Sequence, residues 1–411
     1  MEHIEGGVTA AKGFTANGVC AGIKPGRTKP DLALIYSETS CAVAGVYTQN
    51  LVKAEPVKLT RLRTEKGSAQ AVIANSGNAN ACTGEQGMEN ALRMTRCAAV
   101  ELGAVTELSL PETAVLVCST GVIGQQLPIE VIEGAVPSLV QGLSTDGHKA
   151  AREAIMTTDT YWKEDAVRFE IGGKTVTIGT MAKGSGMIHI NMGTMLGFIT
   201  TDCAISAEML DAALRESAES TYNCVSVDGD TSTNDTLLIL ANGLAGNPPI
   251  TARGRDFDIF LEALNEINTA MARKLAADGE GAEHLIECRV AGARTTETAR
   301  ALAKSVISSS LVKAAFFGKD ANWGRILCAM GYSGELFTPE TTSVSFSNSK
   351  GTVKVFDRGV PLNFDEEKAK IILTEKEVGI LIEMEEGNSH GTAWGCDLTY
   401  KYVEINGDYR T

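Results

Sequence analysis

The chain has 411 residues, and its 51 acidic against 37 basic side chains leave a net charge of −14 at neutral pH. A charge of this sign repels phosphate backbones, so we expect no nucleic-acid partner. Because 44% of the residues are apolar and 21% are charged, the composition excludes intrinsic disorder. A chain of this length forms two domains or one large layered body.

The predicted elements alternate between short β-branched runs and helical patterns, which indicates a mixed α/β fold. Buried strands are predicted at 71–74, 114–118, 175–178 and 195–200, and a helix over 85–102 is expected to end at Gly103. The clearest helix covers 256–277, and a second one covers about 298–309. The last forty residues are predicted to form further strands, with the C-terminus held in the fold. Seven apolar side chains give the 256–277 helix one buried face: Phe257, Phe260, Leu261, Leu264, Ile267, Met271 and Leu275.

Targeting and metal-binding patterns are both absent from the sequence. No apolar run approaches the roughly 18 residues that a membrane helix needs, and the first five residues are acidic where a signal peptide would be basic. We therefore expect a cytoplasmic protein with no membrane partner. The ten cysteines form no Cys-x-x-Cys pair, so buried reduced thiols such as Cys118 and Cys328 are predicted, with no metal site.

One acidic loop, Asp228-Gly229-Asp230-Thr231-Ser232, loosely resembles a calcium-binding loop. A calcium loop requires an acidic residue at its twelfth position, which is Ile239 in this chain. The calcium interpretation is therefore rejected.

The segment 181–194 carries the most informative chemistry. A glycine-rich stretch with Lys183 leads to Gly193 and Thr194, and an apolar strand follows at once. Glycine tolerates strained backbone angles, so the Thr194 hydroxyl can attack the preceding carbonyl and shift the acyl group from nitrogen to oxygen. Hydrolysis would leave Thr194 as a new N-terminus whose α-amine, with a pKa of about 8, can act as a base. By spacing alone, an ordinary turn before a strand is the better interpretation.

Several long motifs, in order and over most of the chain, resemble the ornithine acetyltransferases, the self-cleaving glutamate N-acetyltransferases of arginine biosynthesis. Alongside Thr194-Met195-Leu196, the motifs fall at 75–84, 118–124, 156–160, 183–189, 227–235, 321–325 and 405–411. The resemblance implies a layered α/β sandwich that cleaves itself between Gly193 and Thr194. The expected products are an α chain, 1–193, and a β chain, 194–411, which assemble as an α2β2 heterotetramer.

The resemblance also assigns roles to individual residues. It makes Thr194 the catalytic nucleophile, and Thr120 and Gly121 the oxyanion hole that stabilises the tetrahedral intermediate. A lysine can pair with a substrate carboxylate, and a glutamate can meet the cationic amine of ornithine. Taken alone, Lys183 and Glu280 would fit solvated surface charges. The substrate-binding positions implied by the family are Thr157, Lys183, Thr194, Glu280, Asn406 and Thr411.

Two residues beside the nucleophile depart from the family pattern. Gly193 stands where the family usually has Ala, and Ile190 stands where it usually has Pro. Both changes free the backbone before Thr194, so the strain that drives cleavage is expected to be weaker. Cleavage is still expected, at a changed rate.

The implied reaction is acetyl transfer from N-acetylornithine to glutamate through acetyl-Thr194, with no cofactor. Acetyl-CoA is an open question: if it is a co-substrate, the enzyme is bifunctional. Two alternatives remain open. A related self-processing aminopeptidase or amide hydrolase would pass the acyl group to water, and an uncleaved binding protein would form no acyl-enzyme.

Overall fold

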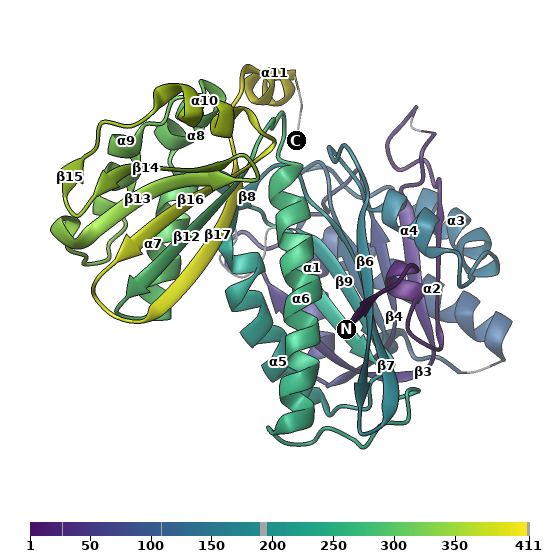
Figure 1. The fold of residues 1–411 in the computed structure, drawn as a ribbon. Coiled ribbons are helices and arrows are strands. Elements are labelled where there is room, and N and C mark those ends of the chain that lie inside the picture. Colours follow the sequence, from purple (N-terminus) through teal and green to yellow (C-terminus); the bar gives the residue numbers. More distant parts are fainter. Residues whose placement is uncertain (27, 108, 190–194, 409–411) are drawn as a thin grey trace.

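The computed structural model describes residues 1–26, 28–107, 109–189 and 195–408. Two mixed β-sheets and eleven α-helices make up this part of the chain (Figure 1). The mixed α/β fold expected from the sequence is therefore confirmed. The predicted cleavage positions 190 and 193–194 lie outside the described residues, as does Thr411.

The larger sheet has nine strands in the order β1-β6-β7-β9-β11-β3-β4-β5, with β2 pairing with β3 off this path. Its central strand β11 is apolar from Leu237 onward, because Leu237 and Ile239 face one core cluster while Leu238 and Leu240 face another. The strand bounds are β1 Glu2–His3, β2 Phe14–Val19, β3 Leu32–Tyr47, β4 Ser68–Asn75, β5 Val115–Ser119, β6 Lys163–Ile171, β7 Lys174–Lys183, β9 Leu196–Thr201 and β11 Thr236–Ala241.

The smaller sheet has eight strands in the order β15-β14-β13-β16-β12-β17-β10-β8. Only β8 comes from the first half of the chain, so the sheet is formed almost entirely by residues after 194. The strand bounds are β8 Ile188–His189, β10 Val225–Thr231, β12 Leu285–Ala293, β13 Thr342–Asn348, β14 Gly351–Asp357, β15 Val360–Pro361, β16 Glu377–Met384 and β17 Ser389–Cys396.

Helix α6 stands between the two sheets and packs against both, against β6 and β7 on one side and β10, β12 and β17 on the other (Figure 1). The helices are α1 Glu55–Thr64, α2 Gly84–Thr106, α3 Ile129–Gln141, α4 His148–Ala154, α5 Ala207–Ser220, α6 Arg255–Ala277, α7 Thr296–Ser308, α8 Ser310–Phe317, α9 Trp323–Gly331, α10 Glu366–Thr374 and α11 Tyr400–Asp408.

The predicted 256–277 helix is confirmed almost to the residue by α6. Six of its seven predicted core side chains are fully buried, and Leu261 is partly buried against the same core. The four predicted strands and the 298–309 helix also lie within or close to β4, β5, β7, β9 and α7. Strong apolar periodicity identified these elements because each buries one or both faces.

The predicted end of the helix at Gly103 was wrong. Helix α2 continues to Thr106 and ends where Glu107 adopts a left-handed conformation, with φ 57°. Leu102 is fully buried, so packing of this turn outweighs the roughly 1 kcal/mol that a glycine costs inside a helix.

The expectation of further strands up to the C-terminus was only half right. Strands β16 and β17 form, but residues 400–408 are the helix α11, and Val403 is 69% exposed. A surface helix satisfies its own backbone hydrogen bonds, whereas a strand there would need a neighbour.

All ten cysteines are free thiols, as predicted, but not all are buried. Burial raises the pKa of thiols such as Cys118 and Cys288 and keeps them inert. Cys328 is exposed instead, because it lies on the solvent face of α9; Cys20 and Cys82 are also exposed.

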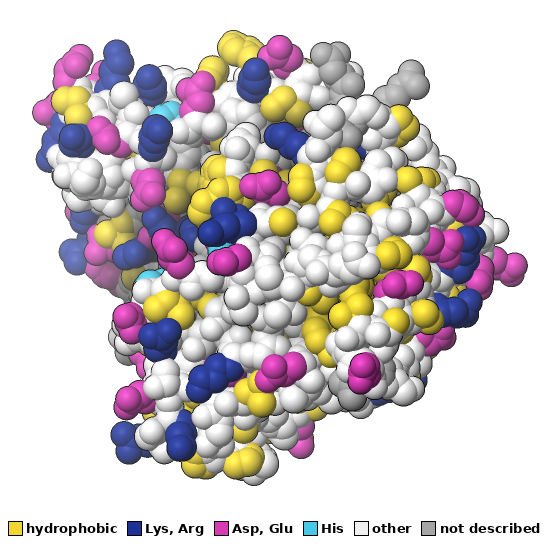
Figure 2. Space-filling view, turned by 90° about the vertical axis from the view of Figure 1, so that its right-hand side faces the viewer, with side chains coloured by type: hydrophobic (Ala, Val, Ile, Leu, Met, Phe, Trp, Pro, Cys, Tyr) yellow, Lys and Arg dark blue, Asp and Glu magenta, His cyan; other side chains and the backbone are white. Residues whose placement is uncertain are grey.

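The surface shows no long single-sign region on the face drawn in Figure 2, where acidic and basic side chains alternate. Among the described residues, no helix is both long and apolar enough to cross a membrane.

Candidate active site

Six of the residues predicted from the sequence line one cavity of about 90 Å³. They come from positions up to 286 residues apart (406 − 120) and from both halves of the chain. The cavity also borders Gly186, Met187 and the 232–234 turn. The six predicted residues are Thr120, Gly121, Thr157, Lys183, Glu280 and Asn406.

The predicted oxyanion hole is a tight turn directly after β5. The backbone N–H of Thr120 donates to the carbonyl oxygen of Asn75 at 2.9 Å, which ties the turn to the end of β4. Gly121 adopts φ 132°, and a Cβ there would lie 2.3 Å from the carbonyl carbon of Gly77. Only glycine allows these two backbones to approach this closely.

Asn234 fastens this turn from the other half of the chain. Its side-chain amide donates to the carbonyl oxygens of Ala79, at 2.6 Å, and Ser119, at 2.8 Å. The Thr233 hydroxyl donates to the Asn234 side-chain oxygen at 2.7 Å and fixes the orientation of that amide. The residue before Thr120 is therefore held by a buried, fully oriented side chain.

Lys183 is the last residue of β7 and extends into the cavity, where it is only 8% exposed. Its Nζ lies 3.4 Å from the Thr120 hydroxyl oxygen. Burial lowers the pKa of Lys183, although Asp159 opposes this shift. No carboxylate of the described residues lies within 4 Å of its Nζ, so the ammonium can pair with a substrate carboxylate.

A buried ionic cluster holds the backbone next to Lys183 in place. Lys163 is fully buried, and its Nζ contacts Asp159 at 2.8 Å and Asp278 at 2.5 Å. Burial alone would raise the pKa of Asp159, but the ammonium groups of Lys163 and Lys183 outweigh it and lower that pKa. Asp159 also accepts the backbone N–H of Gly184 at 2.7 Å, which fixes the chain just after Lys183.

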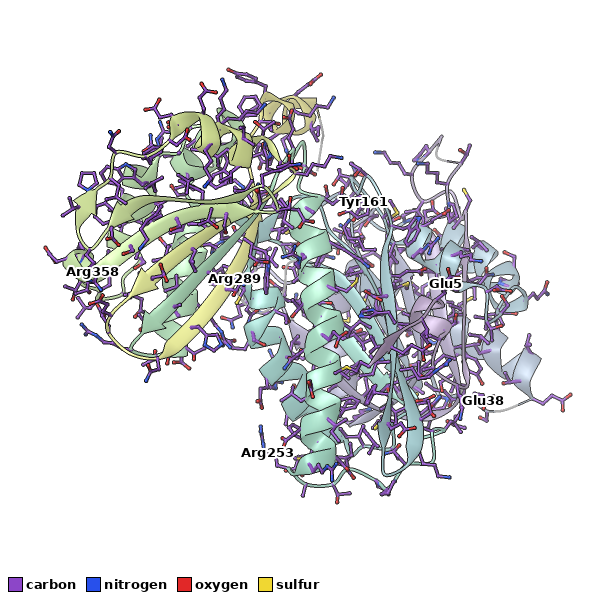
Figure 3. All side chains as sticks on the ribbon, viewed as in Figure 1. Glu5, Glu38, Tyr161, Arg253, Arg289 and Arg358 are labelled. Atoms are coloured by element: carbon purple, nitrogen blue, oxygen red, sulfur yellow. The ribbon has the colours of Figure 1, made fainter. Side chains whose placement is uncertain are left out.

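The same cluster reaches Thr157 and α6. The backbone N–H of Thr157 donates to Asp159 at 3.0 Å, and Thr160 donates to Asp278 through both its N–H and its hydroxyl. The side chain of Tyr161 lies beside the C-terminal end of α6 and donates to the Lys274 carbonyl oxygen at 2.8 Å (Figure 3). The 157–161 segment is therefore fixed to the end of α6.

Glu280 lies two residues after Asp278 and is 9% exposed. Its backbone N–H donates to the Ser185 carbonyl oxygen at 2.9 Å, and its carboxylate accepts the Asn406 amide at 2.8 Å. A Cβ at Gly186 would lie 2.3 Å from the Glu280 carboxyl carbon, so a larger residue at that position would displace the carboxylate from its present place. The carboxylate faces the cavity with Asn406 as its neighbour.

The described residues on either side of the predicted nucleophile are firmly held. The Asp228 carboxylate accepts the backbone N–H groups of Met187, at 2.6 Å, and Ile188, at 2.8 Å. On the other side, the Met195 carbonyl oxygen accepts the N–H of Thr236 at 2.9 Å. The acidic loop that resembled a calcium site therefore anchors β8.

Three of these residues were given no role by the sequence analysis: Asp159, Asp228 and Asn234. All three lie inside motifs that carried the resemblance, at 156–160 and 227–235. Their motif position was the only available signal, because each acts on backbone groups far away in the sequence.

The Asn322-Trp323 pair, which lies in another motif of the resemblance, has a structural role instead. The Asn322 side chain caps α9 by accepting the N–H of Arg325 at 3.2 Å, and Trp323 stacks on Phe356 with ring centroids 5.1 Å apart. Neither residue lines the cavity.

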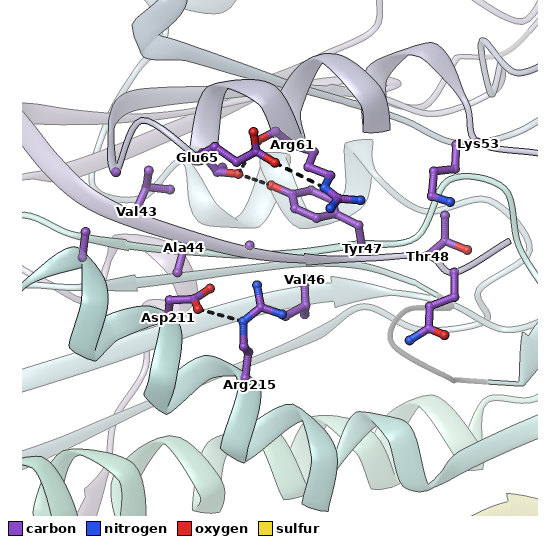
Figure 4. A pocket seen from close by; sticks show the side chains of 15 residues that line it. Val43, Ala44, Val46, Tyr47, Thr48, Lys53, Arg61, Glu65, Asp211 and Arg215 are labelled. Carbon is purple, nitrogen blue, oxygen red and sulfur yellow. Dashed lines mark hydrogen bonds and ion pairs between the residues drawn. The ribbon is translucent and has the colours of Figure 1, made fainter. Parts of the chain in front are cut away.

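A larger cavity, of about 610 Å³, lies between α1 and α5 and contains none of the predicted residues (Figure 4). Four of its five charged side chains form ion pairs, Arg215 with Asp211 at 2.7 Å and Arg61 with Glu65 at 3.5 Å, and Lys53 donates to the Asn50 carbonyl oxygen. The smaller cavity is the candidate active site because it combines an unpaired ammonium, a carboxylate and a glycine turn.

The fold and the site together define a class of protein: a layered α/β enzyme with a small, polar, charged cavity at the junction of its two sheets. The comparisons with known proteins narrow this class. The chain belongs to the ArgJ family, whose family model matches residues 15–411. The resemblance found in the sequence is thereby confirmed.

Similar proteins cover the whole chain. The arginine biosynthesis bifunctional protein ArgJ of Symbiobacterium thermophilum is 54% identical over 100% of both chains. The protein of the same name from Caldanaerobacter subterraneus is 49% identical, again over 100% of both. The crystal structure of the argJ protein from Bacillus halodurans is 43% identical with a TM-score of 0.50; it covers 53% of this chain and 100% of that one.

Proposed function

We propose that this protein transfers the acetyl group of N-acetylornithine to glutamate through an acetyl-Thr194 intermediate, releasing ornithine and N-acetylglutamate. Membership of the ArgJ family confirms the predicted enzyme class, an ornithine acetyltransferase of arginine biosynthesis. The relatives are named bifunctional, so we extend the proposal to a second reaction in which acetyl-CoA is the acetyl donor.

The observation that carries the proposal is the convergence of six predicted residues on one cavity. Lys183 offers a cation and Glu280 an anion, which match the carboxylate and the free amine of an acetylated diamino acid.

Self-cleavage between Gly193 and Thr194 comes first in the proposed mechanism. The Thr194 hydroxyl attacks the Gly193 carbonyl carbon, the peptide C–N bond breaks, and water hydrolyses the resulting ester. The freed α-amine of Thr194 then serves as the general base. The described residues that flank this segment are anchored on both sides: Asp228 of β10 accepts the N–H groups of Met187 and Ile188, and the N–H of Thr236 of β11 donates to the Met195 carbonyl oxygen.

Acylation follows on the new N-terminus. The α-amine accepts the proton of the Thr194 hydroxyl as its oxygen attacks the acetyl carbonyl carbon. The oxyanion accepts hydrogen bonds from the Gly121 N–H and from the Thr120 hydroxyl. Since Lys183 donates to the Thr120 oxygen, the hydrogen of that hydroxyl is free to point at the oxyanion. The α-ammonium then protonates the departing ornithine amine.

Deacylation reverses these roles with glutamate as the acceptor. The glutamate amine attacks the acetyl ester, and the same oxyanion hole stabilises the second tetrahedral intermediate. The α-amine accepts a proton from the attacking glutamate amine and passes it to the Thr194 oxygen as the ester C–O bond breaks, and N-acetylglutamate departs. No metal or cofactor enters either step, and acetyl-CoA would replace N-acetylornithine only in the first.

We further propose that the cleaved α and β chains assemble as an α2β2 heterotetramer in the cytoplasm. The matched Bacillus halodurans chain supports cleavage by its length: all of it aligns with 53% of this chain, about 218 of 411 residues (0.53 × 411). A β chain starting at Thr194 would have 218 residues (411 − 193).

Denaturing mass spectrometry of the purified protein tests the cleavage. We expect two chains of roughly 20 and 23 kDa, in proportion to their lengths, with the larger beginning at Thr194. A single chain near 43.4 kDa would contradict the proposal.

Initial-velocity kinetics tests the transfer. With N-acetylornithine and glutamate varied together, parallel double-reciprocal lines are expected from the acetyl-enzyme, and intersecting lines would overturn it. Release of acetate without glutamate, at the rate seen with glutamate, would identify an amide hydrolase instead.

A further inference from the structure

Outside the cavity, a histidine and two carboxylates meet where the chain enters β12 and leaves β17. We propose that Glu283, His284 and Asp397 form a binding site for one divalent transition-metal ion such as Zn²⁺. The metal-binding atoms of the three side chains lie within 4.8 Å of one another. Because His284 and Asp397 are 113 residues apart, no spacing motif reveals this site in the sequence.

His284 is already held in the form that binds a metal. It is 4% exposed, and its Nδ1 lies 2.9 Å from the carbonyl oxygen of Glu375. A carbonyl only accepts, so Nδ1 carries a hydrogen, and in the neutral ring Nε2 is then the nitrogen with the lone pair. Nε2 is buried and has no hydrogen-bond partner among the described residues. A backbone carbonyl on one ring nitrogen and a free lone pair on the other is the usual arrangement of a metal-binding histidine.

Asp397, like His284, has one side-chain atom held by the backbone and one without a hydrogen-bond partner among the described residues. It is 3% exposed, and its Oδ1 accepts the backbone N–H groups of Glu283, at 2.8 Å, and His284, at 3.0 Å. Its Oδ2 is buried without a hydrogen-bond partner among the described residues. Burying an unpaired carboxylate oxygen is costly, and a bound cation removes that cost.

Glu283 is the third proposed ligand and connects the proposed site to solvent. Its side chain is exposed, which provides a path for the ion. Metal–ligand bonds of about 2.1 Å place two ligand atoms at most about 4.2 Å apart, so a small movement of the exposed Glu283 closes the site. Three nitrogen and oxygen ligands suit a divalent transition metal better than Ca²⁺, which takes six to eight oxygen ligands.

The nearby Lys313 forms no ion pair with the cluster of Glu283, His284 and Asp397. Lys313 is buried nearby, but its Nζ donates to the Cys396 carbonyl oxygen, and no ion pair of the described residues within 4 Å involves Glu283 or Asp397. The cluster therefore brings two carboxylates and an imidazole together with no ammonium or guanidinium of the described residues within 4 Å of either carboxylate.

The proposed ion would join two segments that carry active-site residues. Glu283 and His284 follow Glu280, while Asp397 precedes α11, which carries Asn406. The Thr399 hydroxyl already donates to the Gly281 carbonyl oxygen at 2.7 Å. A metal bridge across the same junction would hold α11, and with it Asn406, against the Glu280 turn.

Zinc titration of the full protein, after removal of metals with a chelator, tests the site. We expect calorimetry to show one tightly bound Zn²⁺ per chain. Asp397→Asn should weaken that binding at least about tenfold, because the amide keeps the Oδ1 contacts but loses the anionic oxygen. Glu283→Gln should also weaken it, and this exposed position leaves folding unaffected. Glu404→Gln, an exposed carboxylate on α11, is the matched control and should bind like the parent.

Adventitious binding by the exposed thiols Cys20, Cys82 and Cys328 has a different signature. It would leave Zn²⁺ affinity unchanged in both Asp397→Asn and Glu283→Gln, and that result, or no saturable binding, would overturn the proposal. Hydrogen exchange tests the bridge separately from catalysis. Zn²⁺ should slow the exchange of the amides at 400–408 in the parent but not in Glu283→Gln; equal exchange with and without Zn²⁺ would exclude it.

Discussion

At the scale of single residues, the active site depends on which polar groups are left unpaired. Lys163 and Lys183 are both buried and both lower the pKa of Asp159, yet Lys163 has two carboxylate partners and Lys183 has none among the described residues within 4 Å. Lys163 is therefore neutralised within the protein, whereas the Lys183 ammonium is left available for the substrate carboxylate that we propose it binds.

Replacing Lys183 by Met should raise the KM for N-acetylornithine by about 10- to 150-fold, since a hydrogen bond to a charged group contributes roughly 1.5–3 kcal/mol. Steady-state kinetics measures this change. Lys304→Met, at a partly buried lysine outside the cavity, is the control. Equal effects of the two substitutions would show that Lys183 does not bind substrate.

The same lysine predicts a pH dependence. Burial lowers the pKa of Lys183 from its ordinary 10.5, so the ammonium loses its charge at a lower pH than an exposed lysine would. The charged form binds the carboxylate. The KM for N-acetylornithine should therefore rise with pH on the alkaline side, below pH 10.5, and Lys183→Arg should move this rise to higher pH.

Gly121 allows a second test at the residue scale. Gly121→Ala places a Cβ 2.3 Å from the Gly77 carbonyl carbon and should displace the oxyanion N–H, lowering kcat by about 10²-fold. Gly124→Ala is a matched control, because Gly124 also has a positive φ, 79°, but open space around its Cβ position. Per cleaved chain, Gly124→Ala should keep its kcat; a comparable loss in both variants would point to backbone strain alone.

At the scale of elements, α6 connects the core to the site. Its buried face packs on both sheets, and the segment after its last turn provides Asp278 and Glu280. The helix therefore sets the position of the Glu280 carboxylate relative to the strand that carries Lys183. Its amphipathic pattern was readable in the sequence, but the partners on its two sides were not.

Leu264→Ala should lower the free energy of unfolding by about 2–5 kcal/mol, because the side chain is fully buried and leaves a cavity. Leu261→Ala, one turn away on the partly buried edge, should cost less. Urea unfolding followed by circular dichroism, at one protein concentration, compares the two midpoints. A larger loss in Leu261→Ala would contradict the packing described for α6.

At the scale of the whole molecule, the predicted cleavage point does not divide the protein into two separate bodies. Strands β9 and β11 come after residue 194, yet they lie between β7 and β3 in the larger sheet. Strand β8, from before residue 190, pairs with β10 in the smaller sheet. The two predicted chains are thus interleaved in both sheets.

Cleaved chains should therefore remain together under native conditions. Native mass spectrometry is expected to show both chains in one particle, a multiple of about 43.4 kDa, from the same sample that denaturing conditions separate. Thr194→Ala should give one intact chain in both measurements. Free α chain in the native spectrum would contradict the interleaved sheets.

The sequence by itself determined the α/β character, the long helix at 256–277 and, through its motifs, the family and six cavity residues. These features depend on local periodicity or on residue identity, which a sequence carries directly. The end of α2, the helix at 400–408 and the exposure of Cys328 were missed because packing of distant segments decides them.

Only the tertiary structure decided the roles of Asp159, Asp228 and Asn234 and the meeting of His284 with Asp397. Each of these side chains acts on groups brought to it by the fold: Asn234 on carbonyl oxygens 115 and 155 residues away, and Asp228 on N–H groups about 40 residues away. Hydrogen bonds and ion pairs require contact, and contact between distant residues follows from the packing of whole elements.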